Sequence, residues 1–144
     1  MKIEKIELRE LTGTMKSKGT FWEERLVRPI DIYPDYRAEG FNETRFGKGQ
    51  DYRKEQEIPV SAIFIEIKTD EGVSGIGGPI DRAQAYLIKE QLVDILIGKD
   101  PLAIELIWDQ MHRFQVHGRQ GTPMMAISAI DCALWDLKGN FLSQ

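Results

Sequence analysis

The stretch that decides the fold is Met124–Lys138, which reads MMAISAIDCALWDLK. Its apolar side chains recur at spacings of four, three and four residues, at Ala126, Ile130, Ala133 and Leu137. This is the period of an α-helix that buries one face, and Ile127 and Leu134 flank the same stripe. The pattern therefore predicts a helix that packs against the rest of the domain.

The residues around this predicted helix indicate where it begins and ends. Thr122 can cap its first turn, and Pro123 suits the first helical position because an N–H has no partner there. Gly139 suits the left-handed residue that follows a helix. Several residues are small enough to let another element approach closely, namely Ala126, Ser128, Ala129, Cys132 and Ala133. Because Cys132 is the only cysteine and lies among them, we expect a buried thiol and no internal disulfide.

Two acidic residues of this predicted helix, Asp131 and Asp136, could have either a structural or a catalytic role. Asp131 and Trp135 are four residues apart and therefore share a helix face, and Asp136 lies beside them. The structural interpretation is that each carboxylate accepts hydrogen bonds from backbone N–H groups or pairs with an arginine. The sequence alone assigns neither acid a catalytic role.

The composition is that of an ordinary globular domain. The chain has 144 residues, of which 42% are hydrophobic and 29% charged, so we expect one domain with its own core. A net charge of −4 and the lack of a basic stripe argue against a nucleic-acid partner. The N-terminus carries no secretory signal, and no apolar run approaches the roughly 20 residues that span a bilayer. We therefore expect a cytoplasmic protein without a membrane partner.

Period-two patterns predict three strands, at Lys2–Leu11, Pro59–Thr69 and Val73–Gly78. Thr12 and Gly13 should end the first strand. Ile63, Ile65 and Ile67 lie on one face of the second strand. A short turn joins the last two strands into a hairpin. The glycines of the third strand should permit either close approach of another part of the backbone or a mobile rim.

Two more helices are predicted before the one described above. Asp81 and Gln84 form a capping box for a helix over Asp81–Ile97. The apolar stripe of that helix is Ile88, Leu92 and Ile95. Asp100 and Pro101 should open the next helix as cap and first residue. Its apolar face is Ile104, Trp108, Met111 and Phe114.

The segment from 14 to 57 does not fit these patterns. It contains seven aromatic, nine basic and nine acidic residues, and it has no sustained periodicity. So long a connection inside a compact domain is uncommon and is usually functional. Its aromatic content argues against simple disorder. The structural alternative is a surface loop that packs on its own domain or on a neighbouring subunit.

The sequence contains no complete catalytic constellation. His112 and His117 are five residues apart and Asp109 precedes them, but no further residue completes a zinc site at a usual spacing. The single cysteine has no histidine beside it in the sequence. Gly47–Gly49 is too short for a phosphate-binding loop. We therefore expect neither catalytic nor metal-binding residues in this chain.

Two stretches resemble a known family. The run AISAIDCALWDLKG, at 126–139, is similar to the end of the N-terminal capping domain in the mandelate racemase/muconate lactonizing branch of the enolase superfamily. The run EIPVSAIFIEIKTDEGVSGIGG, at 57–78, resembles the second and third strands of that domain. The resemblance implies an α+β capping domain over residues 1–144, with a three-stranded, largely antiparallel sheet followed by three helices. Residues 14–57 would be a long insertion in the position of an active-site loop.

The resemblance also implies an activity for a longer protein. In this family the capping domain is followed by a TIM barrel, a fold of about 250 residues. Acids of the barrel hold Mg²⁺, and a Lys or His removes the proton next to a carboxylate. This chain would then supply specificity rather than an acid or base, and we expect it to be inactive alone. Its partners would be its own C-terminal barrel and, in the intact enzyme, further copies in a homo-oligomer.

The resemblance places five residues of this chain near a substrate. Trp22, Arg25 and Arg28 lie in the loop after the first strand, and Pro79 and Ile80 follow the third strand. An arginine can bind a carboxylate through two parallel hydrogen bonds, and a tryptophan can exclude water from a closed site. The structural alternative is that both arginines are solvated or paired with nearby acids. Weaker candidates of the same kind are Arg37, Arg53, His117 and Arg119.

The expected substrate is a small-molecule carboxylate. Because a long polar loop with several arginines suits a polyol carboxylate, the favoured activity is that of a Mg²⁺-dependent acid-sugar dehydratase. Racemase and cycloisomerase activities are the alternatives within the family. A function of another class is also open, namely a stand-alone, non-catalytic binding or assembly module. Such a module would have to cover the apolar faces of its last helix or expose a large patch.

Overall fold

The computed structural model describes residues 1–18, 29–36, 43–44, 47–48 and 55–143. The chain divides into two units, Met1–Leu11 with Ser61–Gln144, and Thr12–Val60. The strands are β1 (Ile3–Lys18), β2 (Glu43–Thr44), β3 (Gly47–Lys48), β4 (Glu55–Thr69) and β5 (Ser74–Ile80). The helices are α1 (Arg82–Leu87), α2 (Val93–Leu96), α3 (Ile104–Phe114) and α4 (Thr122–Leu142). Shorter helical turns are η1 (Pro29–Ile32), η2 (Pro34–Tyr36) and the π-helical turn η3 (Ile88–Leu92).

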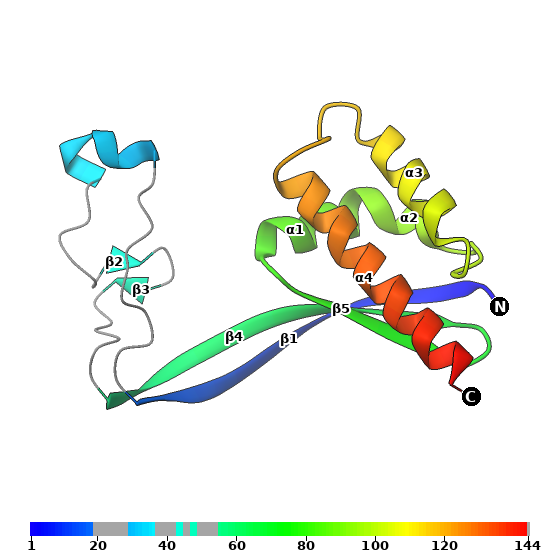
Figure 1. Cartoon of the computed structure of the whole chain (residues 1–144), viewed down its shortest axis with the longest axis horizontal. Coiled ribbons are helices and arrows are strands. Elements are labelled where there is room, and N and C mark those ends of the chain that lie inside the picture. The colour runs from blue at the N-terminus through cyan, green and yellow to red at the C-terminus, as the bar shows by residue number, and fades with distance from the viewer. Residues whose placement is uncertain (19–28, 37–42, 45–46, 49–54, 144) are drawn as a thin grey trace. The chain divides into compact units, whose positions relative to one another are not determined.

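The first unit contains an antiparallel sheet with the strand order β1-β4-β5 (Figure 1). β4 and β5 form the predicted hairpin, in which Ile67 lies opposite Gly75 and Ile65 lies opposite Gly77. Ile65 and Ile67 are completely buried, so the predicted apolar face of this strand is confirmed. The α+β capping fold predicted from the sequence is therefore present.

β1 is longer than the sequence predicts. Thr12 and Gly13 do not end it, and the strand continues to Lys18. β4 also begins earlier than Pro59, at Glu55, so the two neighbouring strands are similar in length. Pairing with a neighbouring strand satisfies the backbone of β1, and this outweighs the local turn signal of two residues.

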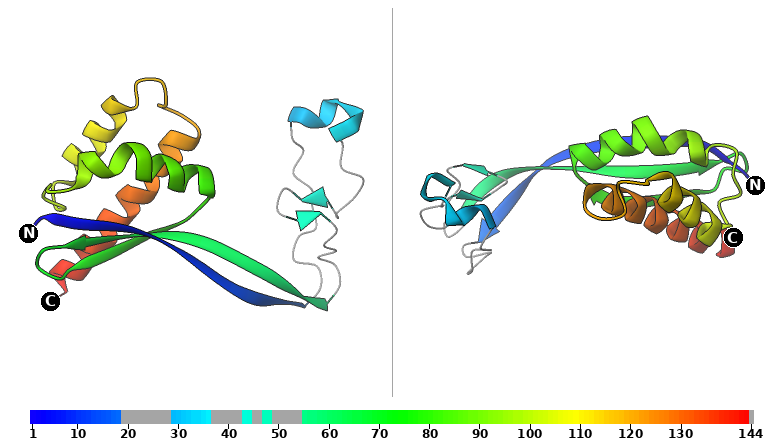
Figure 2. Two further views of the ribbon diagram at one scale, coloured as in Figure 1. Left: turned by 180° about the vertical axis from the view of Figure 1, so that it is seen from behind. Right: turned by 90° about the horizontal axis from the view of Figure 1, so that it is seen from above.

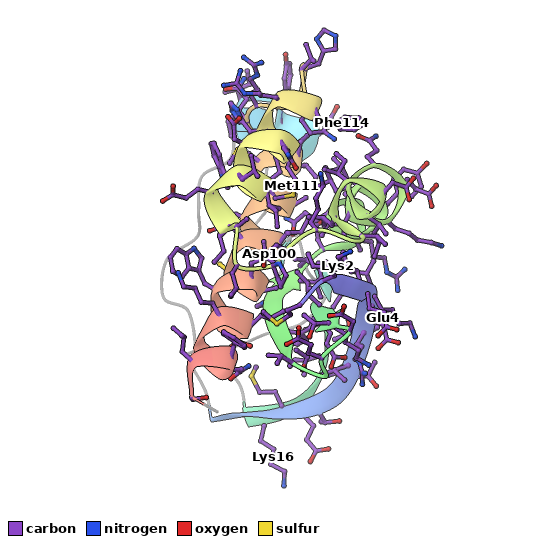
Figure 3. The ribbon with its side chains drawn as sticks, turned by 90° about the vertical axis from the view of Figure 1, so that its right-hand side faces the viewer. Lys2, Glu4, Lys16, Asp100, Met111 and Phe114 are labelled. Atoms are coloured by element: carbon purple, nitrogen blue, oxygen red, sulfur yellow. The ribbon has the colours of Figure 1, made fainter. Side chains whose placement is uncertain are left out.

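The helices of the first unit pack together on the sheet. α4 lies across β5 in Figure 1. In the opposite view of Figure 2, the strands lie between α4 and the viewer. Met111 of α3 is completely buried in this core, whereas Phe114 at the end of α3 is 56% exposed (both labelled in Figure 3). The largest fully buried side chains are Ile3, Ile65, Ile67, Ile88, Leu92, Leu96, Ile107, Met111, Ile127, Ile130, Leu134 and Leu137. The core of the first unit thus joins the sheet to α1, η3, α2, α3 and α4.

Glycine in β5 allows α4 to approach the sheet unusually closely. A Cβ on Gly77 would lie 2.2 Å from the carbonyl oxygen of Ala129, which is far inside van der Waals contact. The other nearest atoms to this Cβ are the backbone nitrogen and the Cβ of Ala133, at 3.0 and 3.1 Å. The predicted close approach is therefore confirmed for the glycines of the strand and for Ala129 and Ala133 of the helix.

The ends of α4 differ from the predicted ends. The N-cap is Gly121, with a φ of 68°, and not Thr122, which is already helical. Gly139 lies inside the helix instead of ending it. The helix continues because Asn140 donates a hydrogen bond of 3.0 Å to the carbonyl oxygen of Ser74 and Phe141 packs against the core. Contacts with the sheet thus outweigh the local stop signal of a glycine.

Cys132 is exposed on α4, so the prediction of a buried thiol is wrong. The buried residues of α4 recur on one side of the helix, and Cys132 lies on the opposite side with exposed Ser128 and Trp135. The run of small residues extends around the helix, whereas among these small residues it is Ala129 and Ala133 that lie against Gly75 and Gly77 of β5. Small size alone therefore did not indicate which face was buried.

The start of α3 also differs from the prediction. Asp100 accepts a 2.9 Å hydrogen bond from the N–H of Leu102 through its side chain, which forms a turn rather than a helix cap. The helix begins three residues after Pro101, at Ile104. The buried face of α3 also differs from the predicted one. Ile107, 2% exposed, belongs to the core with Met111, whereas Phe114 does not.

The second unit contains short elements within the segment 14–57. β2 and β3 pair as an antiparallel hairpin in which Glu43 lies opposite Lys48 and Thr44 opposite Gly47. The segment therefore contains local structure that its lack of periodicity did not predict. In the described residues of both units, no helix combines the length and hydropathy needed to span a membrane.

Candidate functional site

β5 ends in an irregularity at the position where the sequence predicts substrate contact. The register shifts here, so that Gly78 and Pro79 of β5 lie opposite Phe64 of β4. Gly78 has a φ of 123°, and a Cβ there would lie 3.3 Å from the ring of Phe64. Bulges of this kind bend a strand and re-aim its side chains, and they are frequent beside binding sites. The positive φ at position 78 therefore requires glycine. Pro79, next to it, is exposed to solvent.

A capping box fixes the chain immediately after this bulge. The carboxylate of Asp81 accepts a 2.8 Å hydrogen bond from the N–H of Gln84, and the side chain of Gln84 accepts one of 3.2 Å from the N–H of Asp81. The amide of Gln84 also contacts the sulfur of Met125 on α4, at 3.8 Å. The predicted capping box is confirmed, and it ties the bulge to both α1 and α4.

The residues predicted to contact substrate are not brought together by the described part of the structure. Pro79 is exposed, whereas Ile80 is 7% exposed and belongs to the core. Trp22, Arg25 and Arg28, together with the weaker candidates Arg37 and Arg53, lie outside the described residues. His117 and Arg119 are exposed between α3 and α4. Substrate contact by any of these residues stays a prediction.

No metal site is formed by the residues that the structure describes. These residues contain no group of three or more His, Cys, Asp or Glu side chains arranged to hold an ion. Arg113 donates a 2.7 Å hydrogen bond to Asp109, and the ring of His112 stacks on Trp108 with 4.8 Å between centroids. Both potential ligands on α3 thus have structural partners, so the described residues do not fit a Mg²⁺ or zinc site.

A network of charges covers the start of β1 and the facing part of β4. Glu7 pairs with Lys5, Arg9 and Lys68, and these partners lower its pKa from 4.5 to about 2, the bond from Lys5 being the largest cause. The carboxylate of Glu66 forms an ion pair with the guanidinium of Arg9, with 2.6 Å between nitrogen and oxygen. The alternation of charged and apolar residues in this strand was visible in the sequence, but its partners on β4 were not.

The two acids of α4 have different surroundings. Asp136 accepts a 2.9 Å hydrogen bond from the backbone N–H of Ile76, which confirms the structural interpretation for this residue. Asp131 is partly buried, and burial raises the pKa of its carboxyl. Trp135 is exposed and has the ammonium of Lys138 over its ring, at 4.8 Å.

β4, β5, the bulge between them and the helices α1 to α4 all lie within one segment that matches a family of known proteins. The family model described as mandelate racemase/muconate lactonizing enzyme, N-terminal domain, matches residues 55–144, which is more than half of the chain. This chain belongs to the mandelate racemase/muconate lactonizing enzyme family. The match covers β4, β5 and all four helices of its N-terminal domain.

Individual members of the mandelate racemase/muconate lactonizing enzyme family share this domain. D-galactonate dehydratase of Ralstonia pickettii (strain 12J) is 39% identical over 88 residues, which are 59% of this chain and 23% of that protein. The crystal structure of rhamnonate dehydratase from Gibberella zeae complexed with Mg matches 56% of this chain and 20% of its own, at 35% identity and a TM-score of 0.54. The 3,6-anhydro-D-galactonate cycloisomerase from Zobellia galactanivorans matches 99% of this chain and 29% of its own, at 25% identity and a TM-score of 0.61. The chain thus spans less than a third of the length of these relatives.

Proposed function

We propose that this chain is the capping domain of a Mg²⁺-dependent enzyme that removes the proton next to a carboxylate, and that the enzyme is an acid-sugar dehydratase. The observation that carries the proposal is the 39% identity over 88 residues to a D-galactonate dehydratase. The rhamnonate dehydratase, at 35% identity, is a second relative that acts on a sugar acid. Its crystals contain Mg, which supports the choice of metal.

In this proposal the chain supplies walls and specificity rather than catalytic groups. A C-terminal barrel would hold the Mg²⁺ and the base. Arg25 and Arg28 would bind the substrate carboxylate, and Trp22 would exclude water. Pro79, exposed on the bulge of β5, would contact the substrate from a second side. The proposal includes a cytoplasmic location and a homo-oligomer of the complete enzyme, without membrane or nucleic-acid partners.

A cycloisomerase is the second candidate. The cycloisomerase from Zobellia galactanivorans matches 99% of this chain, whereas the match to the rhamnonate dehydratase covers 56%. That broader match includes the segment 14–57, in which three of the predicted substrate contacts lie. The identity is lower, however, at 25%, so the dehydratase has the stronger support.

The proposal is tested on the complete protein as its host produces it, after its intact mass has been measured. The protein is incubated with Mg²⁺ and a panel of sugar acids that includes galactonate and rhamnonate. Dehydration yields a 2-oxo acid, which semicarbazide converts into an absorbing product, and NMR in D₂O follows exchange of the α-proton. We expect a 2-oxo acid from at least one sugar acid, loss of activity with EDTA, and recovery with added Mg²⁺.

Each other result has a defined meaning. Exchange of the α-proton without a 2-oxo acid would replace the dehydratase by a racemase. A cyclic or rearranged product would favour the cycloisomerase. An intact mass of 16.5 kDa together with no exchange on any substrate would overturn the enzyme proposal and favour the non-catalytic module.

A further inference from the structure

The outer edge of β5 is bound by side chains of a helix instead of by another strand. β5 is the last strand in the order β1-β4-β5, so one of its edges faces away from β4. Asp136 of α4 accepts a 2.9 Å hydrogen bond from the N–H of Ile76, and Asn140 donates one of 3.0 Å to the carbonyl oxygen of Ser74. In an antiparallel strand the groups of every second residue point to the same edge, so these are outward-facing groups of β5.

The two side chains form one clamp, which we call the Asp136–Asn140 pair. The amide of Asn140 also donates to the carboxylate of Asp136, at 3.3 Å, so each side chain orients the other. They reach the edge because Gly75 and Gly77 let the backbone of α4 come within van der Waals contact of β5. A strand with larger residues at these two positions would hold α4 too far away.

The end of this edge and the start of the opposite edge are also covered without a strand. Near the end of β5, Pro79 has no N–H that a further strand could bind. On the other side of the sheet, the N–H of Ile3 donates to the carbonyl oxygen of Lys99, and the N–H of Gly98 donates to that of Ile3, both at 2.8 Å. The turn after α2 therefore covers the start of β1.

We propose that the Asp136–Asn140 pair prevents β5 from pairing with β5 of a second copy of this chain. Unpaired N–H and C=O groups at a sheet edge attract other strands. The exposed side chain of Ile76, at 54%, would add apolar surface to such a contact. Two copies of one edge can pair antiparallel about a two-fold axis, so an identical chain is the partner that the edge fits.

The experiment uses the complete protein and a double variant, Asp136→Ala with Asn140→Ala. The matched control is Ser128→Ala with Asp131→Ala, on the same helix but outside the contact with Ser74 and Ile76. Sedimentation velocity over a hundredfold range of concentration reports association, and hydrogen exchange reports the amide of Ile76. A third variant adds Ile76→Lys to the double variant, because a lysine on an edge strand discourages pairing.

We expect the double variant to form a species of at least twice the mass of the parent protein, while the control sediments like the parent. At low concentration its Ile76 amide should exchange about tenfold faster, as expected for the loss of one hydrogen bond. The added Ile76→Lys should restore the parent's mass. The proposal is overturned if the folded double variant keeps the parent's mass throughout, or if Ile76→Lys leaves the larger species unchanged. If far-ultraviolet circular dichroism shows the double variant unfolded, Asp136→Leu, which has a similar shape but cannot accept a hydrogen bond, decides by the same criteria.

Discussion

Gly75 of β5 lies so close to Ala133 of α4 that a Cβ on Gly75 would be 2.2 Å from the carbonyl oxygen of Ala133. The same Cβ would be 2.4 Å from the backbone nitrogen of Leu137. Both neighbours belong to the backbone of a helix, which cannot move aside as the end of a flexible side chain can. The absence of a side chain at Gly75 is therefore a requirement of the packing.

Gly75→Ala should destabilise the protein by about 3 kcal/mol, at the upper end of the usual cost of overpacking a core. Urea denaturation of the purified protein measures the change in the free energy of unfolding. Gly139→Ala is the matched control, because no atom lies within 4 Å of a Cβ at this position inside α4. It should stabilise by about 0.5–1 kcal/mol through helix propensity. Equal effects of the two substitutions would contradict the packing described for β5 and α4.

Asp81→Ala should lower the free energy of unfolding by about 1 kcal/mol, because it removes the acceptor for the N–H of Gln84. Asp81→Asn should retain most of the stability, since asparagine also caps helices well. The exposed Lys89→Ala, further along the same helical segment, serves as a surface control with an effect below about 0.5 kcal/mol. The side chain of Asp81 would have no stabilising role as a cap if the alanine and asparagine variants had the same midpoint of urea denaturation.

Replacement of Glu7 should change the dependence of stability on pH. Its pKa in the folded protein, about 2, lies below the ordinary value of 4.5. A lowered pKa contributes stability above pH 4.5, and that contribution is lost as the pH falls from 4.5 towards 2. The difference in unfolding free energy between the parent and Glu7→Gln should therefore shrink over this window.

Lys68→Met is the companion variant for this measurement. It removes one of the cations that hydrogen-bond to Glu7, so the remaining loss of stability should occur at a higher pH than in the parent. Urea titrations at half-unit steps of pH supply both curves. A constant difference between the parent and Glu7→Gln from pH 5 to pH 2 would refute the assignment.

If the complete protein is the proposed sugar-acid dehydratase, Arg25→Ala and Arg28→Ala should each raise its KM by about tenfold to a hundredfold, with a smaller change in kcat. The reason is that a charge-assisted bond to the substrate carboxylate is lost in the ground state as well as in the transition state. Arg113→Ala is the control, because this arginine pairs with Asp109 on α3. An unchanged KM in both variants would remove the arginines from the proposed substrate site.

Cys132 should be protected in the complete protein, although it is exposed on this domain. If α4 packs against a C-terminal barrel, alkylation of Cys132 under native conditions should be at least tenfold slower than after denaturation. Peptide mapping by mass spectrometry identifies the modified cysteine. Rapid native alkylation would mean that this face of α4 is open in the complete protein, so that no barrel packs against it.

Much of the fold could be predicted because its signals lie within single elements. The alternation in β4, the stripe of α4 and the capping box at Asp81 each involve residues that are close in sequence. The errors had two causes. Gly139 remains helical because its neighbours contact the sheet, and a local pattern does not encode such distant contacts. Asp100 forms a turn with Leu102 instead of the cap of α3, because the same side chain can serve either of two local structures.

The candidate site was predictable only in part for the same reason. The glycines of β5 correctly predicted a close approach of another backbone segment. The predicted end of the third strand, at Gly78, coincides with the bulge. The partner of Asp136 was not predictable, because Ile76 lies 60 residues away and offers only a backbone N–H. Ile80 was predicted to contact substrate from its position in the chain; the structure adds that it is 7% exposed, and its substrate contact stays a prediction.

The π-helical turn at Ile88–Leu92 has a consequence for comparing this chain with its relatives. A uniform α-helix that buries Ile88 would bury Ile95, seven residues later, but here Leu96 is completely buried and Ile95 only partly. One extra residue has in effect been absorbed into the helix. Alignments should therefore place a one-residue gap in this turn, because an ungapped alignment would pair core positions of a straight-helix homologue with surface positions of this one.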